Sequence, residues 1–204
     1  DADTTSNKGG YDEILSSFGN GEADILVGTQ MIVKGHDFPN VTLVGVIAAD
    51  LSLFGGDYHG AEKTFQLLTQ AAGRAGRGES KGNVVIQTYQ PDHFSILAAK
   101  HQNYQEFYDQ EILYRKLLRY PPVSNLMVIL ISATVEEEAQ RKLEQLLAFI
   151  KEEQKESTKL SIVGSGDAAV SKIQDVYRKV IYCRHESYDG LTDLKEAIKL
   201  KGLH

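Results

Sequence analysis

The chain has 204 residues and a formal net charge of -6, from 22 lysines and arginines against 28 aspartates and glutamates. This length allows one large domain or two small ones, and the negative charge excludes a surface that is basic all over, so any contact with nucleic acid must be local. The single cysteine, Cys183, excludes an internal disulfide and a cysteine zinc cluster. The lack of a disulfide fits a reducing cytoplasm, and without an apolar run of membrane-spanning length we expect no membrane contact.

Helices and strands are predicted to alternate in the first part of the chain. Helical spacing covers residues 11–18 and 62–72, and a long helix that carries most of the aromatic residues on a packing face is expected over 94–118. Short apolar runs, typical of parallel strands buried on both faces, cover residues 24–28, 41–48 and 83–88. This order predicts an α/β domain with a parallel sheet and right-handed crossovers.

Tyr120-Pro121-Pro122 breaks the long helix and marks a predicted domain boundary, which gives domains over residues 1–120 and 121–204. The second domain has the order β-α-β-β-α, with elements expected over 126–133, 135–155, 160–163, 176–183 and 191–200. This predicts a small α+β domain. Such a domain usually has one more strand, so we expect that a final strand has been cut off or lost.

Two segments carry residues suited to phosphate chemistry. Gln70-Ala-Ala-Gly-Arg74-Ala-Gly-Arg77 places two guanidiniums three residues apart, on one side of a helical turn. Guanidinium is planar, permanently charged and bidentate toward phosphate oxygens, and Gly73 and Gly76 let the backbone approach a polyanion. The alternative is a solvated basic helix end. About forty residues upstream, Gly28-Thr-Gln-Met-Ile-Val-Lys-Gly-His-Asp-Phe-Pro39 lies between two apolar runs.

In this order and at this separation, the two segments resemble motifs V and VI of superfamily 2 helicases. Further stretches resemble the bacterial replication-restart helicases among them: Asp1 to Thr5, Asp24 to Met31, Lys34 to Pro39, Ala61 to Gln70 and Arg119 to Pro122. The resemblance implies a RecA-like second helicase lobe followed by an α+β C-terminal domain. The chain starts without Met inside a motif-bearing loop, which suggests an excised fragment.

In such helicases ATP lies between two lobes, and the second lobe supplies arginine fingers. The resemblance therefore assigns Arg77 to the γ-phosphate, with Arg74 beside it and Gln70 orienting the nucleotide or the finger. Without such a role, Gln70 is an exposed polar residue of a helix. The phosphate loop Gly-x-x-x-x-Gly-Lys-Ser/Thr is absent from the sequence. We therefore expect the isolated chain to be inactive, with ATP and Mg²⁺ both requiring a first lobe.

The loop of motif V is expected to contact both the nucleotide and DNA. Gly35 permits a tight backbone path, and Asp37 either accepts a hydrogen bond from a ribose hydroxyl or caps the Phe-Pro turn. Thr29, Gln30 and Lys34 are predicted to contact DNA phosphates, which positions DNA without reading its sequence. Asp50, after the second strand of the sheet, either couples the nucleotide to DNA or caps the strand end.

The last third of the chain offers a second candidate DNA surface. Lys172, Arg178 and Lys179 form its most basic patch, which is either a solvated strand face or a contact for single-stranded DNA or for the acidic tail of single-stranded-DNA-binding protein. Alternation along a strand puts Arg178 and Lys179 on opposite faces. The Gly164-x-Gly166-x-x-Ala169 stretch mimics a dinucleotide fingerprint, which we reject because no repeated βαβ unit surrounds it.

The resemblance predicts part of an ATP-dependent DNA helicase that binds forked and single-stranded DNA and restarts replication with other primosome proteins. Zinc is expected in the parent protein but not in this chain, so no metal ligand is assigned. One alternative is the lobe of another superfamily 2 translocase or RNA helicase. Another is a nonenzymatic DNA- or protein-binding module.

Overall fold

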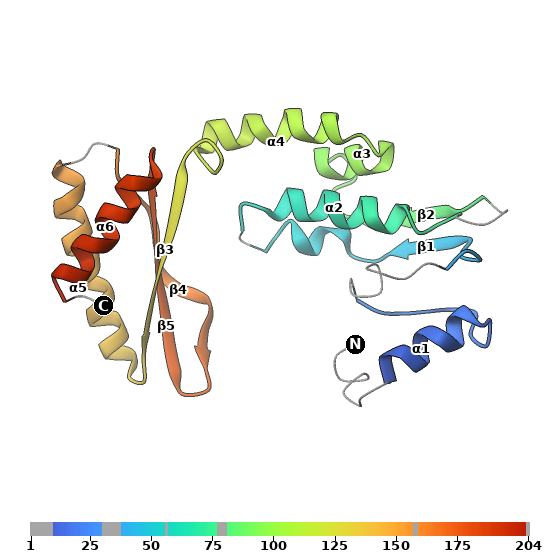
Figure 1. Cartoon of the computed structure of the whole chain (residues 1–204), viewed down its shortest axis with the longest axis horizontal. Helices are drawn as coiled ribbons and strands as arrows, with labels where there is room; N and C mark the ends of the chain where they lie inside the picture. Colours follow the sequence, from blue (N-terminus) through green and yellow to red (C-terminus); the bar gives the residue numbers. More distant parts are fainter. Residues whose placement is uncertain (1–9, 30–37, 56, 77–80, 157–158, 203–204) are drawn as a thin grey trace. The chain divides into compact units, whose positions relative to one another are not determined.

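The structure is a computed structural model that describes residues 10–29, 38–55, 57–76, 81–156 and 159–202. The chain divides into two compact units, residues 1–112 and 113–204 (Figure 1). The division falls within the long helix α4 (Tyr104–Leu118), upstream of the boundary predicted from Tyr120-Pro121-Pro122.

The first unit is built around a parallel β-α-β segment. Strands β1 (Leu43–Val46) and β2 (Asn83–Ile86) pair in parallel, with Leu43 opposite Asn83, and helix α2 (Gly60–Ala72) connects them. The unit also contains α1 (Gly10–Gly19), a 3-10 turn η2 (Ala49–Ser52) and α3 (Phe94–His101). Its core consists of Ala49, Phe65, Leu68, Ile96, Ala98, Ala99 and Phe107. The predicted α/β class with a parallel sheet is confirmed.

The strand predicted over residues 24–28 does not form. Ile25 and Val27 are 79% and 85% exposed, and among the described residues no strand pairs with this segment. An apolar run becomes a strand only where neighbouring backbone groups satisfy its N–H and C=O groups. The described sheet of this unit contains only β1 and β2, so residues 24–28 have no described strand with which to pair.

The long helix predicted over residues 94–118 is broken in two. Gln102 ends α3 in the left-handed conformation, with φ of 51°, and its N–H donates to the carbonyls of Ala98 and Ala99. The break lets α4 fold back so that the Phe107 ring stacks on Phe65, with centroids 4.5 Å apart. The expected packing face is thus present, although Tyr104 and Tyr108 of the same helix remain exposed.

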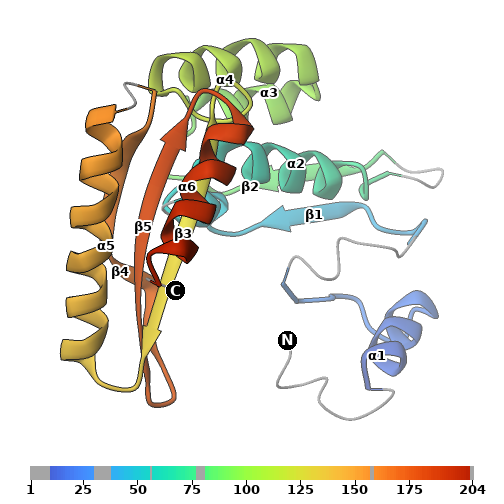
Figure 2. The ribbon, with the colours of Figure 1, turned by 60° about the vertical axis from the view of Figure 1, so that its left-hand side comes forward.

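The second unit has the predicted order β-α-β-β-α. Its elements are β3 (Asn125–Ala133), α5 (Glu136–Glu156), β4 (Ser161–Ile173), β5 (Val176–His185) and α6 (Tyr188–Leu200). The strands form an antiparallel sheet in the order β3-β5-β4. Both helices cover the same face of this sheet (Figures 1 and 2), and bury a core of Ile131, Leu143, Leu146, Ile150, Leu160, Ile181, Cys183, Leu191, Leu194 and Ile198.

Strand β4 is much longer than the predicted 160–163. The sequence signal stops early because Gly164 and Gly166 interrupt the apolar alternation, whereas the strand continues along β5, with Gly164 opposite Tyr182 and Asp167 opposite Lys179. The Gly-x-Gly stretch therefore lies inside an antiparallel strand rather than in a strand-to-helix turn. Because a dinucleotide fingerprint requires a turn from a strand into a helix, this stretch is not one.

Candidate functional site

The arginine-glycine segment follows the C-terminal end of α2. Phe65, Leu68 and Ala71 bury one face of the helix, which leaves Gln70 exposed on the other. The helix ends where the Gly73 N–H donates to the Thr69 carbonyl at 3.0 Å. Arg74 follows, half-buried, and its N–H donates to the Ala71 carbonyl at 3.0 Å. Gln70, Gly73 and Arg74 therefore lie together at one end of a helix that is fixed by the core.

Gly76 is required by the backbone path. Its φ is 72°, and a Cβ built on it would lie 2.5 Å from the amide nitrogen of Gly82. A Cβ on Gly82 would in turn lie 2.2 Å from the nitrogen of Gly76. The two backbones cross so closely that only glycine fits at both positions. The sequence suggested that Gly76 admits a polyanion, and gave no sign of this structural role.

The two motif segments meet at the amino ends of the parallel strands. The Gly76 N–H donates to the Val41 carbonyl at 3.0 Å, and the Val41 N–H donates to the Phe38 carbonyl at 3.3 Å. The Asn83 N–H, at the start of β2, donates to the Thr42 carbonyl at 2.8 Å. The end of the first segment, Phe38, is thus connected to Gly76 of the second through a chain of backbone hydrogen bonds.

Several predicted site residues cannot be placed. Arg77, Gln30, Lys34, Gly35 and Asp37 lie outside the described residues. Thr29, the last described residue before the gap, is exposed and lies outside any helix or strand.

Asp50 is at the opposite, carboxyl end of the parallel strands. It is 4% exposed, and its carboxylate accepts hydrogen bonds from the Thr88 hydroxyl at 2.5 Å and from the Tyr89 amide at 2.9 Å. These bonds, that from Thr88 foremost, hold the pKa of the carboxyl below its ordinary value. Asp50 thus joins the ends of β1 and β2, as expected of a capping carboxylate.

In the second unit, the pairing of β5 separates the predicted basic residues. Lys179 is buried on the helix-covered side, and its ammonium lies 2.7 Å from the Asp167 carboxylate. Lys172 is opposite Tyr177, on the same face as Lys179, and its ammonium lies 4.5 Å from the centre of the Tyr177 ring. Arg178 points to the other face, because neighbouring residues of a strand alternate. Lys172 and Arg178 therefore do not form one patch.

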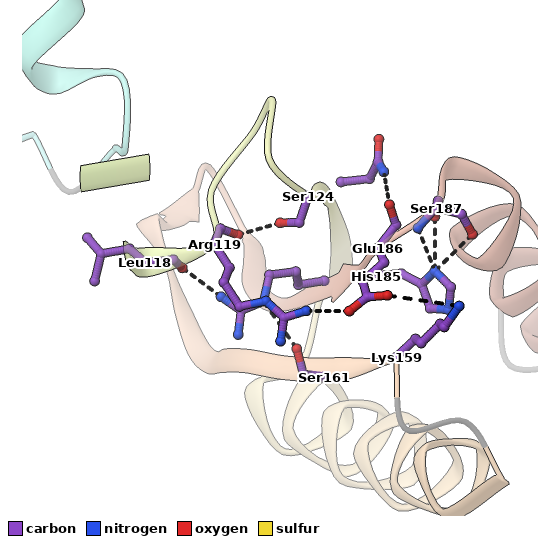
Figure 3. Close-up of polar contacts among 10 residues, drawn as sticks. Leu118, Arg119, Ser124, Lys159, Ser161, His185, Glu186 and Ser187 are labelled. Carbon is purple, nitrogen blue, oxygen red and sulfur yellow. Dashed lines mark hydrogen bonds and ion pairs between the residues drawn. The ribbon is translucent and has the colours of Figure 1, made fainter. Parts of the chain in front are cut away.

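A polar cluster holds the Arg119-Tyr-Pro-Pro122 turn against the end of β5 (Figure 3). Arg119 pairs with Glu186 at 2.7 Å, and Ser124 donates to the Arg119 carbonyl. Arg184 donates to the carbonyl of Leu118, the last residue of α4, at 2.7 Å. The beginning of the turn is thereby attached to the end of β5 and to the residue that follows it.

Sequence reasoning missed Arg184 and Glu186. Both lie at the end of a predicted strand, more than sixty positions from their partners Leu118 and Arg119. The spacing of residues along a single sequence carries no signal for such a contact.

Each of the two units matches the model of a known protein family. The model of the helicase conserved C-terminal domain matches residues 3–79, and that of the primosomal protein N C-terminal domain matches residues 116–201. The fold of the first unit and the first match define the conserved C-terminal lobe of a helicase.

Curated relatives match almost the whole chain. It is 45% identical to the replication restart protein PriA of Bacillus subtilis over 97% of its length, and 44% identical to that of Synechocystis over 92%. The protein of the same name from Haemophilus influenzae is 37% identical over 92% of the chain. The chain therefore belongs to the PriA family of replication restart proteins. It spans about a quarter of the length of these relatives.

None of the helices in the described part of the chain is long and apolar enough to cross a membrane.

Proposed function

We propose that the first unit acts as the second RecA-like lobe of an ATP-dependent DNA helicase in a longer protein. The observation that carries this proposal is the junction of the two motif segments at the amino ends of β1 and β2, through the Gly76–Val41 hydrogen bond of 3.0 Å. A helicase lobe needs its nucleotide-contacting and DNA-contacting segments on one rigid support, so that a structural change at the nucleotide alters the contacts to DNA.

The residues present fit one half of an ATP site. Arg74, at the end of a core-anchored helix, is suited to phosphate oxygens, and Arg77 follows three positions later. The sequence has no phosphate loop, and the described residues contain no cluster of His, Cys, Asp or Glu that could hold a metal ion. Bound Mg-ATP would supply the phosphoryl group for transfer to water, and the metal ligands would come from another lobe.

On this proposal, Arg77 contacts the γ-phosphate and Arg74 shares the phosphate contacts. Gln70 orients the nucleotide or the arginine, and Gly73 gives the backbone room beside it. A cation placed where charge develops in phosphoryl transfer raises the rate by roughly 10³- to 10⁵-fold. Asp37 and Gly35 contact the nucleotide, whereas Thr29, Gln30 and Lys34 contact DNA phosphates.

We propose that the longer protein binds forked DNA, unwinds it with ATP, and assembles other primosome proteins when replication restarts. The printed name of the relatives, replication restart protein, supports this proposal. Single-stranded-DNA-binding protein is a proposed partner, and zinc is proposed for the longer protein outside this chain. The cytoplasm is the proposed compartment.

The test is Arg77→Ala in the full-length protein. We expect most of the DNA-stimulated ATPase to be lost while fork binding stays within about threefold, because the charge acts mainly in the transition state. Arg77→Lys should restore little activity, since ammonium does not reproduce the planar fork of guanidinium. The matched control is Arg141→Ala, which removes an exposed arginine from α5.

Turnover of Arg77→Ala within about threefold of the wild type would overturn the assignment, because the loss expected for a finger is far larger. If ATPase and fork binding fall together, Arg77 serves binding or folding and not the reaction. Mixing this chain with a matching first lobe and measuring ATPase separates a helicase lobe from a nonenzymatic module, which would restore nothing.

A further inference from the structure

The C-terminal end of α1 is fixed by backbone hydrogen bonds. The Glu22 N–H donates to the Ser17 carbonyl at 2.9 Å, and the Gly21 N–H donates to the Phe18 carbonyl at 3.2 Å. Gly21 has a φ of 77°, and two such bonds around a glycine in the left-handed conformation are a common way in which a helix ends. Phe18 therefore has a defined place in the last turn of α1.

The Phe38 ring packs against this last turn. Its centroid lies 5.0 Å from that of Phe18, and the two ring planes are 82° apart, which is the edge-to-face arrangement that aromatic pairs prefer. The ring also lies beside Gly19, where a Cβ would be 3.6 Å from a ring carbon, an ordinary van der Waals distance. Leu15, one turn before Phe18, is buried, so the side of α1 that carries Phe18 is the side that packs.

A short path of backbone hydrogen bonds leads from Phe38 to the arginine-glycine segment. The Phe38 carbonyl accepts from the Val41 N–H at 3.3 Å, and the Val41 carbonyl accepts from the Gly76 N–H at 3.0 Å. Gly76 follows Arg74 by two positions and directly precedes Arg77 in the sequence. Each link of this path is a direct contact, so a shift of the Phe38 ring is transmitted to the backbone between the two arginines.

We propose that Phe18 is a positioning residue for ATP turnover, which acts through the Phe38 ring to fix the backbone of Gly76 and with it the neighbouring arginines. A cation stabilises a transition state only from the correct place, and a displacement of about 1 Å can lower a rate by roughly a hundredfold. The proposal rests on the proposed function in taking Arg77 as the arginine finger.

The first test measures ATPase in the full-length protein. Phe18→Leu should lower the kcat of the DNA-stimulated reaction about ten- to a hundredfold and leave KM for ATP within about threefold, because the misplaced arginine charge acts mainly in the transition state. Phe18→Tyr keeps the ring and should retain kcat within about threefold. Ile14→Ala is the matched control, since it shortens an exposed side chain of the same helix, and it should leave kcat unchanged.

A purely structural role of Phe18 would lower kcat in a different way, by reducing the number of folded molecules. Titration with fork DNA counts the molecules that bind, and kcat is therefore expressed per binding-competent molecule. On this scale Phe38→Leu should reproduce the loss seen in Phe18→Leu. The double variant should lose no more than either single variant, because one residue acts through the other.

The contact itself is tested in this chain, which contains no tryptophan. The single indole of Phe38→Trp should emit at shorter wavelength than free indole in water while it packs on α1. Adding Phe18→Ala should shift the emission to longer wavelength and make it easier to quench with iodide. Adding Gly19→Ala should change neither property, because the new methyl group makes only an ordinary contact.

Three results would overturn the proposal: wild-type kcat per binding-competent molecule in Phe18→Leu, equal losses in Phe18→Leu and Phe18→Tyr, or an indole emission that does not respond to Phe18→Ala. Wild-type turnover in Arg77→Ala would refute the proposed function instead. Loss of turnover in Arg77→Ala together with wild-type turnover in Phe18→Leu would remove only the role of Phe18. Failure of one proposal is therefore distinguishable from failure of the other.

Discussion

Two arginines of the polar cluster at the end of β5 should contribute very differently to stability. Arg184 donates to the Leu118 carbonyl at 2.7 Å and to the Ser161 hydroxyl at 3.3 Å. Arg119 forms an ion pair with Glu186 at 2.7 Å, but both side chains are about half exposed, at 52% and 49%. The shortest contact is 2.7 Å long in both cases, so the number of contacts and the type of acceptor distinguish the two arginines.

The expected magnitudes follow from these differences. A hydrogen bond from a charged donor contributes about 1.5–3 kcal/mol, and a cation at a helix C-terminus adds about 0.3–1 kcal/mol. Because the bond to the Leu118 carbonyl is exposed, we take the lower part of this range, and expect Arg184→Ala to destabilise the second unit by about 2 kcal/mol. Arg119→Ala removes an exposed ion pair and should cost under about 1 kcal/mol.

The assay uses Cys183, which is buried in the core of the second unit and reports its opening. Labelling by a thiol reagent under native conditions measures the population of the opened unit when closing is fast. Arg184→Ala should accelerate labelling about 30-fold, and Arg119→Ala by less than about fivefold. Since residue 184 is next to the thiol, each rate is divided by the rate of the same variant in concentrated urea.

Equal acceleration by the two substitutions, or a larger effect of Arg119→Ala, would refute this reasoning. It would mean that the exposed ion pair, and not the bond to the helix end, attaches the turn to the sheet. Hydrogen exchange of the β5 amides should give the same order of the two variants.

Burial raises the pKa of the Cys183 thiol to about 11, so native labelling should stay slow between pH 7 and pH 9 and become fast when urea unfolds the chain; fast native labelling would contradict the buried position. Gly76→Ala should destabilise the first unit by more than about 1 kcal/mol, because a positive φ and a backbone clash act together, whereas Gly21→Ala, with φ of 77° and open space around it, isolates the first effect; equal losses of melting temperature would argue against the clash. Calorimetry should find Mg-ATP binding to the isolated chain no tighter than millimolar, since the phosphate loop is absent, and micromolar affinity would require a complete site. In the full-length protein, Thr29→Ala should weaken single-strand binding equally for all sequences, as expected for a phosphate contact; a loss confined to some sequences would instead indicate base readout.

The sequence alone predicted the fold class and the family, because both depend on local patterns. The parallel strands, the helices between them and the Gly-Arg-x-Gly-Arg segment are readable from periodicity and residue chemistry. The expected burial of these strands on both faces was wrong, because β1 and β2 expose alternate residues, with Leu43 61% and Val85 59% exposed. The same holds for the β-α-β-β-α order of the second unit and for the opposite faces of Arg178 and Lys179, since alternation is a property of the strand itself.

Tertiary structure decided what depends on partners far away in the sequence. The run at residues 24–28 has the composition of a strand but no described neighbour to pair with, and the length of β4 was set by β5 rather than by its own residues. Gly76 needs to be glycine because the backbone at Gly82 crosses it, and Arg184 acts through a helix end sixty-six positions away. Pairing also decides the neighbours of Tyr182, since only the register places it opposite Gly164 and apart from Lys172. A single sequence shows which residues are available for such contacts but not which of them pair, because the contacts form only when distant segments come together in the folded chain.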